Sequence, residues 1–455
     1  MLQKVKQNLP KLTLTAGLLQ PRLIAPVIFV VVTLILGITG KGLAFVREDI
    51  MMINLFKTYP VDWARIFTEG WTGLYGNSFP WIDWSYRPLE MVIDWGLINL
   101  FGESEVLHIC FKSAVVGLCA VLIYLLVFEI TRKPSLAIAS AIFSSLSVPM
   151  IIEGWWFHHM VVYTEIVILL GLLCYQRYQR HHKFKWLAIF WLCALIAPLI
   201  GEYGISLVLI VLIGSIVESI IQRRLDWKFQ ISSLILLVTA LYPQFLPSLI
   251  IEQKLALTSI FTRGYQELAL ASGALGIINP GLPYLLMIGA LTPLLTLTAF
   301  LFLLIHHICR RKEYSNLVII LVTILFLLAI ITAKVYPPPT YSWGDIASVP
   351  FDFYYALPIM FPVLFALLSW RLNRFVVIWF LISYLPFIKI HHLSVNLIPA
   401  LIPWTILLLA WLDRLVSEFE LQKVKDIFKS SGFRIKSLAS FLVILILAAG
   451  LISQI

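Results

Sequence analysis

Charged residues are scarce in this 455-residue chain: Asp, Glu, Lys and Arg make up 13% of it, whereas apolar residues make up 60%. A soluble domain carries about twice that share of charge. A membrane-spanning helix needs about 20 mostly apolar residues, and runs of that kind recur along nearly the whole sequence. No soluble domain of ordinary size has room to fold, so we expect an all-α, polytopic transmembrane protein.

Several signatures of other protein classes are absent from the sequence. The five cysteines have no metal-ligand spacing and form no pair in an expected outer loop, so neither a disulfide framework nor a zinc site is indicated. There is no glycine-rich phosphate loop, Ser-His-Asp signature or internal repeat. The net charge of +10 comes from short basic clusters between apolar runs. We therefore expect no nucleic-acid partner, and attribute the charge to membrane topology.

The apolar runs predict about thirteen spans. Their approximate limits are residues 23–40, 106–130, 135–152, 160–176, 186–201, 204–221, 229–251, 282–305, 317–335, 354–370, 375–390, 397–412 and 437–455. Most of the 34 Lys and Arg residues fall on alternate connections. Because cytoplasmic loops carry this excess, we expect a cytoplasmic N-terminus and an extracytoplasmic C-terminus.

The acidic residues favour the opposite side. Glu153, Glu165 and Glu202 fall near the outer ends of their spans. A carboxylate within hydrocarbon costs several kcal/mol unless it faces a polar cavity or a partner. These residues indicate a cavity that opens outward, or, for Glu153 and Glu202, helix-end side chains that reach interfacial water. Glu165 lies several residues deeper, where that second interpretation is harder to sustain.

The first outer loop, residues 41–105, interleaves acids with many Tyr and Trp residues. Such rings favour the headgroup layer, where an apolar ring and a polar edge are both satisfied. The sequence therefore predicts amphipathic helices lying on the membrane, over Met52–Ala64 and Pro88–Leu100, separated by a Gly- and Pro-rich stretch. An aromatic belt would anchor any membrane protein, but it does not explain the acids.

The order of short motifs in the first 225 residues is informative. An acidic pair, Glu48-Asp49, follows the first span, then come Tyr86-Arg87-Pro88-Leu89, an Asn99-Leu100-Phe101-Gly102 turn and His108. Further on lie Pro149, Glu153-Gly154-Trp155-Trp156 and Gly201-Glu202-Tyr203.

This order resembles the GT-C superfamily of membrane glycosyltransferases, which includes protein O-mannosyltransferases and lipid A aminoarabinose transferases. The sequence departs from that family at Gly201, where the family has a lysine. The resemblance implies a GT-C-like module over residues 1–225, with the outer loop 41–105. A variable transmembrane module would follow over residues 226–455, with a cytoplasmic amphipathic helix at 413–436.

The resemblance also implies an activity. It is the transfer of a sugar from a polyprenyl phosphate or diphosphate donor to a lipid, glycan or protein acceptor, outside the cytoplasm and in a bacterial inner membrane. Such a transfer needs a base for the acceptor proton, for which Asp49 is the first candidate and Glu48 the second. It also needs a cation for the leaving phosphate, for which Arg87 is best placed.

Other residues are candidates for the substrate site: Tyr86, Glu153, His158, His159, Glu165, Glu202 and Arg263. Carboxylate oxygens and a donor phosphate can hold Mg²⁺ or Mn²⁺, and Glu48, Asp49 and Glu153 are candidate ligands. The sequence does not decide whether a metal is used.

Three alternatives remain open. A transporter or flippase of lipid-linked saccharide would place ionisable residues through both halves of the membrane. An O-antigen ligase or polymerase-like enzyme would place Arg and His in a late outer loop, of which His391-His392 is a faint version. A noncatalytic membrane scaffold is the third, because fold alone does not establish activity.

Overall fold

A computed structural model describes residues 21–41, 47–58, 61–69, 87–155, 161–223, 229–239, 366–367, 369–384 and 398–418. These residues are almost entirely helical and include no strand, so the all-α prediction is confirmed for them. The chain divides into two compact units, Met1–Leu212 with Asp226–Pro247 and Ile213–Leu225 with Ser248–Ile455. The division expected near residue 225 stays a prediction.

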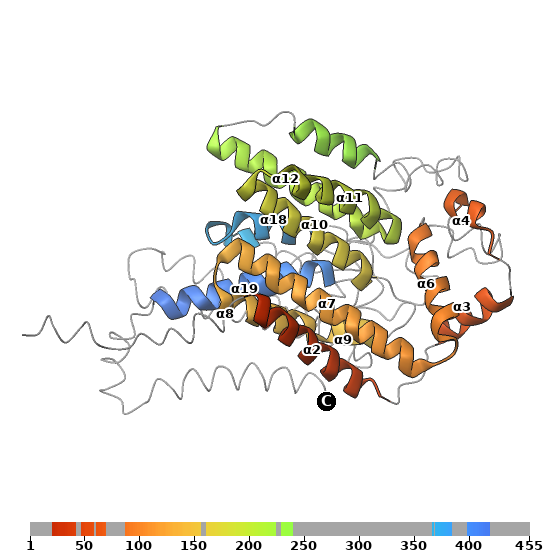
Figure 1. Cartoon of the computed structure of the whole chain (residues 1–455). Coiled ribbons are helices and arrows are strands. Elements are labelled where there is room, and N and C mark those ends of the chain that lie inside the picture. The colour runs from red at the N-terminus through yellow and green to blue at the C-terminus, as the bar shows by residue number, and fades with distance from the viewer. Residues whose placement is uncertain are drawn as a thin grey trace, which may run out of the picture. The chain divides into compact units, whose positions relative to one another are not determined.

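The first unit holds most of the described helices (Figure 1). They are α2 (Pro21–Thr39), α3 (Arg47–Thr58), α4 (Trp63–Glu69), α6 (Pro88–Phe101), α7 (Glu105–Thr131), α8 (Pro134–Ser145), α9 (Val148–Trp155), α10 (Val161–His181), α11 (Phe184–Ile200), the short 3₁₀ helix η3 (Glu202–Gly204) and α12 (Ile205–Gln222), which crosses into the second unit. A further short helix covers Phe229–Thr239.

Helices α2 and α7 lie side by side over much of their length (Figure 1). A glycine permits this approach: a Cβ at Gly117 would lie 2.3 Å from Thr33 Oγ1 and 3.1 Å from the carbonyl oxygen of Phe29. At the end of α2, the Trp155 indole N–H donates to the Leu36 carbonyl at 3.2 Å. The end of α2 therefore lies beside the end of α9.

Successive helices run in alternating directions. At one end of the unit, Arg180 near the end of α10 donates to Glu129 near the end of α7. At the opposite end, a Cβ at Gly201 would lie 2.6 Å from Thr164 Oγ1, so α11 ends where α10 begins. Turns with left-handed backbone at Arg132 and His182 close α7 and α10. This alternation is the one that the apolar runs predicted for this part of the chain.

Three described helices are long and apolar enough to cross a membrane: Glu105–Thr131, Val161–His181 and Ile205–Gln222. A fourth span is obtained if α8 and α9 are taken together. The other apolar helices among the described residues, such as Leu23–Thr39 and Phe184–Ile200, are 10–17 residues long. The length and apolar composition of these helices indicate a membrane protein.

The span expected over residues 135–152 is not one straight helix. Pro134–Ser145 and Pro149–Trp155 meet at an angle of 65°. The bend falls at Pro149, which has no amide N–H to continue the backbone hydrogen bonds of the first segment, and the expected span stays a prediction. The bend sets the direction of α9 and therefore the position of Glu153.

The helices of the first outer loop differ in part from the prediction. The helix expected over Pro88–Leu100 is confirmed as α6, with proline in its first turn and a positive φ of 57° at Gly102 after its end. The helix expected over Met52–Ala64 was wrong. Val61 and Asp62 are not helical and separate α3 from α4, as is understandable with Pro60 in the sequence just before them.

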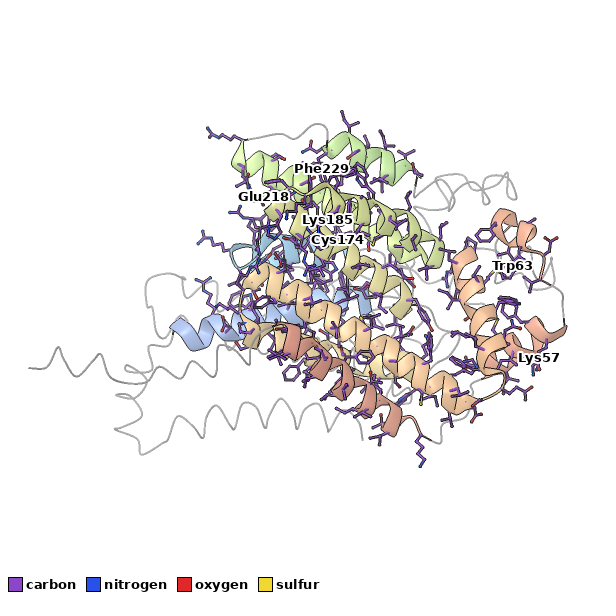
Figure 2. All side chains as sticks on the ribbon, viewed as in Figure 1. Lys57, Trp63, Cys174, Lys185, Glu218 and Phe229 are labelled. Atoms are coloured by element: carbon purple, nitrogen blue, oxygen red, sulfur yellow. The ribbon has the colours of Figure 1, made fainter. Side chains whose placement is uncertain are left out.

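The three loop helices pack on one another. The rings of Trp63 on α4 and Trp95 on α6 meet edge to face, 5.1 Å between centroids, and Figure 2 labels Trp63 beside α6. Lys57 on α3 forms an ion pair with Glu103 after α6. These contacts hold α3 and α4 to α6, which itself contacts α7 and α11.

In the second unit the described residues form η5 (Ser369–Arg371), α18 (Arg374–Tyr384) and α19 (Ile398–Glu418). Helices α18 and α19 pack together through Phe380 and Trp404, whose ring centroids are 5.0 Å apart. The Trp411 indole N–H donates to Ser369 Oγ. Asp413 and Arg414 lie within α19, and the rest of the amphipathic helix expected over 413–436 lies beyond the described residues after Glu418.

Candidate functional site

Five helices of the first unit each bury one polar side chain near the others. They are Asp49 on α3, Asp94 on α6, Lys112 on α7, Glu153 on α9 and Tyr163 on α10. None of the five is more than 9% exposed. We call this set the acid–lysine cluster.

Lys112 and Glu153 are the centre of the cluster. The Lys112 ammonium donates to Glu153 Oε1 at 3.4 Å, and it lies 4.6 Å from the centroid of the Tyr163 ring. Glu153 Oε1 also accepts from the backbone N–H of Val162 at 3.1 Å. That N–H belongs to the first turn of α10, where the helix itself offers no acceptor, so Glu153 joins α9, α10 and α7.

Asp94 lies close enough to Lys112 and Asp49 to interact with both charges. Burial raises the pKa of Asp94 well above its usual value, the positive charge of Lys112 lowers it, and the negative charge of Asp49 raises it again. Burial dominates, because taking a carboxylate out of water disfavours its charged form. Asp94 therefore favours its protonated state.

Asp49, the first candidate base, lies in the first turn of α3 and is 1% exposed. Its position next to Asp94 places it in the cluster and away from bulk solvent. The side chain of Glu48, the second candidate, lies outside the described residues.

Glu153 contradicts one of the two interpretations of the outer acids. It is fully buried and bonded within the protein, so the idea that it reaches interfacial water was wrong. The bend between α8 and α9 explains the difference, since it directs α9 toward α7 and α10.

Arg87, the candidate for the leaving phosphate, precedes α6 and is partly exposed. Its Nη1 donates to Glu90 Oε2 at 3.3 Å, one turn into α6. Tyr86 lies outside the described residues. The nearby Phe-Gly turn is held by His108, whose Nε2 lies 3.0 Å from the Gly102 carbonyl oxygen and whose ring packs edge to face on Phe101. His108 thus fixes the junction of α6 and α7.

Glu165 lies in the first turns of α10 and is fully buried. Within the described part of the chain, neither of its carboxylate oxygens has a hydrogen-bond partner. Cys119, two turns after Lys112 on α7, lies close to both Glu165 and Glu153. Glu165 therefore extends the line of polar groups deeper between α7 and α10.

The remaining candidates are not placed. The side chain of Glu202 lies outside the described residues, although its backbone belongs to η3. His158, His159 and Arg263 lie outside them altogether.

Sequence reasoning did not select Lys112, Asp94 or Tyr163. A signal for Lys112 was present: it is the lone Lys or Arg inside the apolar run of residues 106–130, where an unpaired ammonium is costly. Asp94 and Tyr163 had no comparable signal. Asp94 is one of several acids in the outer loop, and Tyr163 is one aromatic residue within an apolar run.

A metal site is not formed by the described residues alone. Within these ranges, no three His, Cys, Asp or Glu side chains come together as metal ligands would. Asp49 and Glu153 belong to one cluster, but Lys112 occupies the position beside Glu153 that a cation would take.

No model of a known protein family matches the chain, and no curated protein sequence matches it either.

Proposed function

We propose that this protein is a GT-C-type glycosyltransferase with about thirteen spans, which moves a sugar from a polyprenyl phosphate or diphosphate donor to an acceptor outside the cytoplasm. The observation that carries the proposal is the burial of Asp49, from the early acidic pair, beside Asp94 and the Lys112–Glu153 ion pair. A buried carboxylate at such a position is costly unless it has a use or a partner.

Asp49 is the base in this proposal. It takes the proton of the acceptor hydroxyl while the acceptor oxygen bonds to the anomeric carbon of the sugar. The bond from that carbon to the donor phosphate oxygen breaks, and its electron pair goes to the phosphate. A single carboxylate suffices, because the leaving phosphate needs no proton.

The charges of the cluster support this assignment. Asp49, Asp94 and Glu153 would carry three negative charges against the one positive charge of Lys112, and such a site would repel a donor phosphate. Burial raises the pKa of Asp94, which favours the loss of one of those charges. Lys112 is paired with Glu153, and Asp49, in the same cluster, is the carboxylate that we assign to the acceptor proton.

Arg87 is the proposed partner of the phosphate. It stands at the start of α6, the helix that carries Asp94, and its guanidinium can bond two phosphate oxygens at once. Its contact with Glu90 orients the guanidinium from one turn away. Arg87 and Asp49 thus come from two helices that pack together in the outer loop.

The distribution of buried charge favours a transferase over a transporter. Within the described helices, the buried acids Asp49, Asp94, Glu153 and Glu165 gather toward one end of the first unit, and Glu129 at the other end is paired with Arg132 and Arg180. A transport route would need ionisable groups through both halves of the membrane.

The test uses the full chain in liposomes, with polyprenyl phosphate hexoses radiolabelled in the sugar as donors and extracted envelope lipids and glycans as acceptors. Release of polyprenyl phosphate and transfer of label are measured. We expect Asp49→Asn to lower the rate about a hundredfold or more, and the exposed Asp62→Asn to leave it unchanged. Full activity of Asp49→Asn would refute the base. Movement of intact donor across the bilayer without release would support a flippase instead.

A further inference from the structure

A second cluster of charge lies at the opposite end of the first unit, around the turn between α10 and α11. The described basic residues there are Arg132, Lys133, Arg177, Arg180, Lys183 and Lys185. Glu129 is the one acid among the described residues of α7, α10 and α11 at this end. Figure 2 labels Lys185 in this region, away from Lys57 and the loop helices.

Glu129 is already engaged with two of the cations. Its carboxylate accepts from Arg132 Nη2 at 2.7 Å and from Arg180 Nη1, and its carbonyl oxygen accepts from Arg180 Nη2 at 2.9 Å. This arrangement joins the ends of α7 and α10. Within the described residues of α7, α10 and α11, no other carboxylate lies at this end.

Arg177 and Lys185 share one aromatic ring. The Arg177 guanidinium carbon lies 4.8 Å from the centroid of the Trp186 ring, and Lys185 Nζ lies 5.0 Å from it. Among the described residues, neither cation is paired with a carboxylate. Both charges lie beside the same indole, so they repel each other, and an anion that contacts both would relieve that repulsion.

An apolar surface begins at the same turn. Phe184, the first residue of α11, is 67% exposed, and Leu192 and Leu195 are 56% and 40% exposed. Phe184, Trp191 and Leu195 are seven and four residues apart, so they fall on one helix face. The rings of Phe184 and Trp191 meet edge to face at 6.0 Å. Cations and an exposed apolar face are thus contiguous.

We propose that the α10–α11 turn binds an anionic phospholipid, with its phosphate between Arg177 and Lys185 and an acyl chain along Phe184, Trp191 and Leu195. A soluble phosphate would use the two cations but not the apolar face. An indole beside them is also the side chain that favours the headgroup layer. The proposal is independent of glycosyl transfer, since its residues lie at the opposite end from the acid–lysine cluster.

The test measures lipid binding by native mass spectrometry of the full chain in mild detergent. Phosphatidylglycerol should bind in preference to phosphatidylcholine, and less so at high salt. Each basic side chain near an anionic headgroup contributes about a fivefold change in affinity. Arg177→Gln with Lys185→Gln should therefore lower phosphatidylglycerol affinity roughly thirtyfold. The matched control, Lys41→Gln with Lys57→Gln, removes the same charge elsewhere and should leave binding unchanged.

Two further arms separate the possible outcomes. Arg177→Lys with Lys185→Arg keeps both charges and should retain phosphatidylglycerol binding, which guards against loss through misfolding. Glycerophosphoglycerol, the headgroup without acyl chains, and inorganic phosphate should compete poorly. Equal competition by these soluble phosphates, or unchanged phosphatidylglycerol binding in the Gln double variant, would overturn the proposal.

Discussion

Lys112 and Glu153 form a buried ion pair across α7 and α9, with Nζ and Oε1 3.4 Å apart and neither side chain more than 1% exposed. Removing one member leaves the other charge buried without its partner. We expect Lys112→Met to destabilise the protein by about 3–5 kcal/mol. Thermal unfolding in detergent, followed by intrinsic fluorescence, measures this loss.

The double variant distinguishes a structural pair from two separate contributions. Lys112→Met combined with Glu153→Gln removes both charges, and Gln retains an oxygen for the Val162 N–H. It should therefore recover most of the stability lost in Lys112→Met, because matched removal of a buried pair is often nearly neutral. If the stability lost in the double variant equalled the sum of the losses in the two single variants, the two side chains would not be coupled.

Asp94 predicts a dependence of stability on pH. Burial, as the largest cause, raises its folded-state pKa above its unfolded value of 3.8, so the folded state binds this proton more tightly. The resulting stabilisation is fully present below pH 3.8 and is lost as pH rises through the folded-state pKa. Asp94→Asn removes that proton equilibrium.

Thermal midpoints across the range from pH 5 to pH 9 test this prediction. The wild type should lose stability relative to Asp94→Asn as pH rises. The exposed Asp62→Asn carries the same chemical change outside the cluster and is the matched control for the substitution itself. A difference between wild type and Asp94→Asn that does not change with pH would mean that Asp94 is ionised throughout.

The sequence predicted the helices well where its apolar runs are long. Helix α7 covers the run of residues 106–130, and α6 begins at Pro88 and ends at the Phe-Gly turn. It predicted less well where a proline interrupts a run, as at Pro149, because the direction after such a break depends on packing with distant helices. The 13-span count depends on runs outside the described residues and stays a prediction.

The candidate site was only partly visible in the sequence. Asp49 and Glu153 were selected because acids are rare near apolar spans, and both are buried in one cluster. Asp94 was not selected, since one face of α6 cannot be told from the other until α3 and α7 are packed on it. The rarity of a charged residue in an apolar segment shows that the residue is unusual. Which side chains lie next to it is known only from the tertiary structure.

Gly117 is expected to set the distance between α2 and α7. Gly117→Val places carbon atoms where Thr33 Oγ1 and the Phe29 carbonyl oxygen lie, and should destabilise the protein by about 1–3 kcal/mol. Gly37→Ala on α2 is the matched control, because nothing lies within 4 Å of its added Cβ. That change should be neutral or stabilise by up to about 1 kcal/mol. Thermal unfolding of both variants checks the contrast, which an equal loss in the two would contradict.

The orientation of the two ends can be tested by labelling from one side of the membrane. In a variant without cysteines, Lys57→Cys reports the end with the acid–lysine cluster, and Lys183→Cys reports the end with the α10–α11 turn; both positions are exposed. Since basic clusters stay in the cytoplasm, a membrane-impermeant maleimide added to intact cells should label Lys57→Cys, and should label Lys183→Cys only after the membrane is opened.

The reverse pattern would put the carboxylates on the cytoplasmic side, where a donor presented on the outer leaflet cannot reach Asp49. Labelling of both sites in intact cells would instead show that the two ends of the first unit lie on the same side, contrary to a spanning arrangement of α7 and α10.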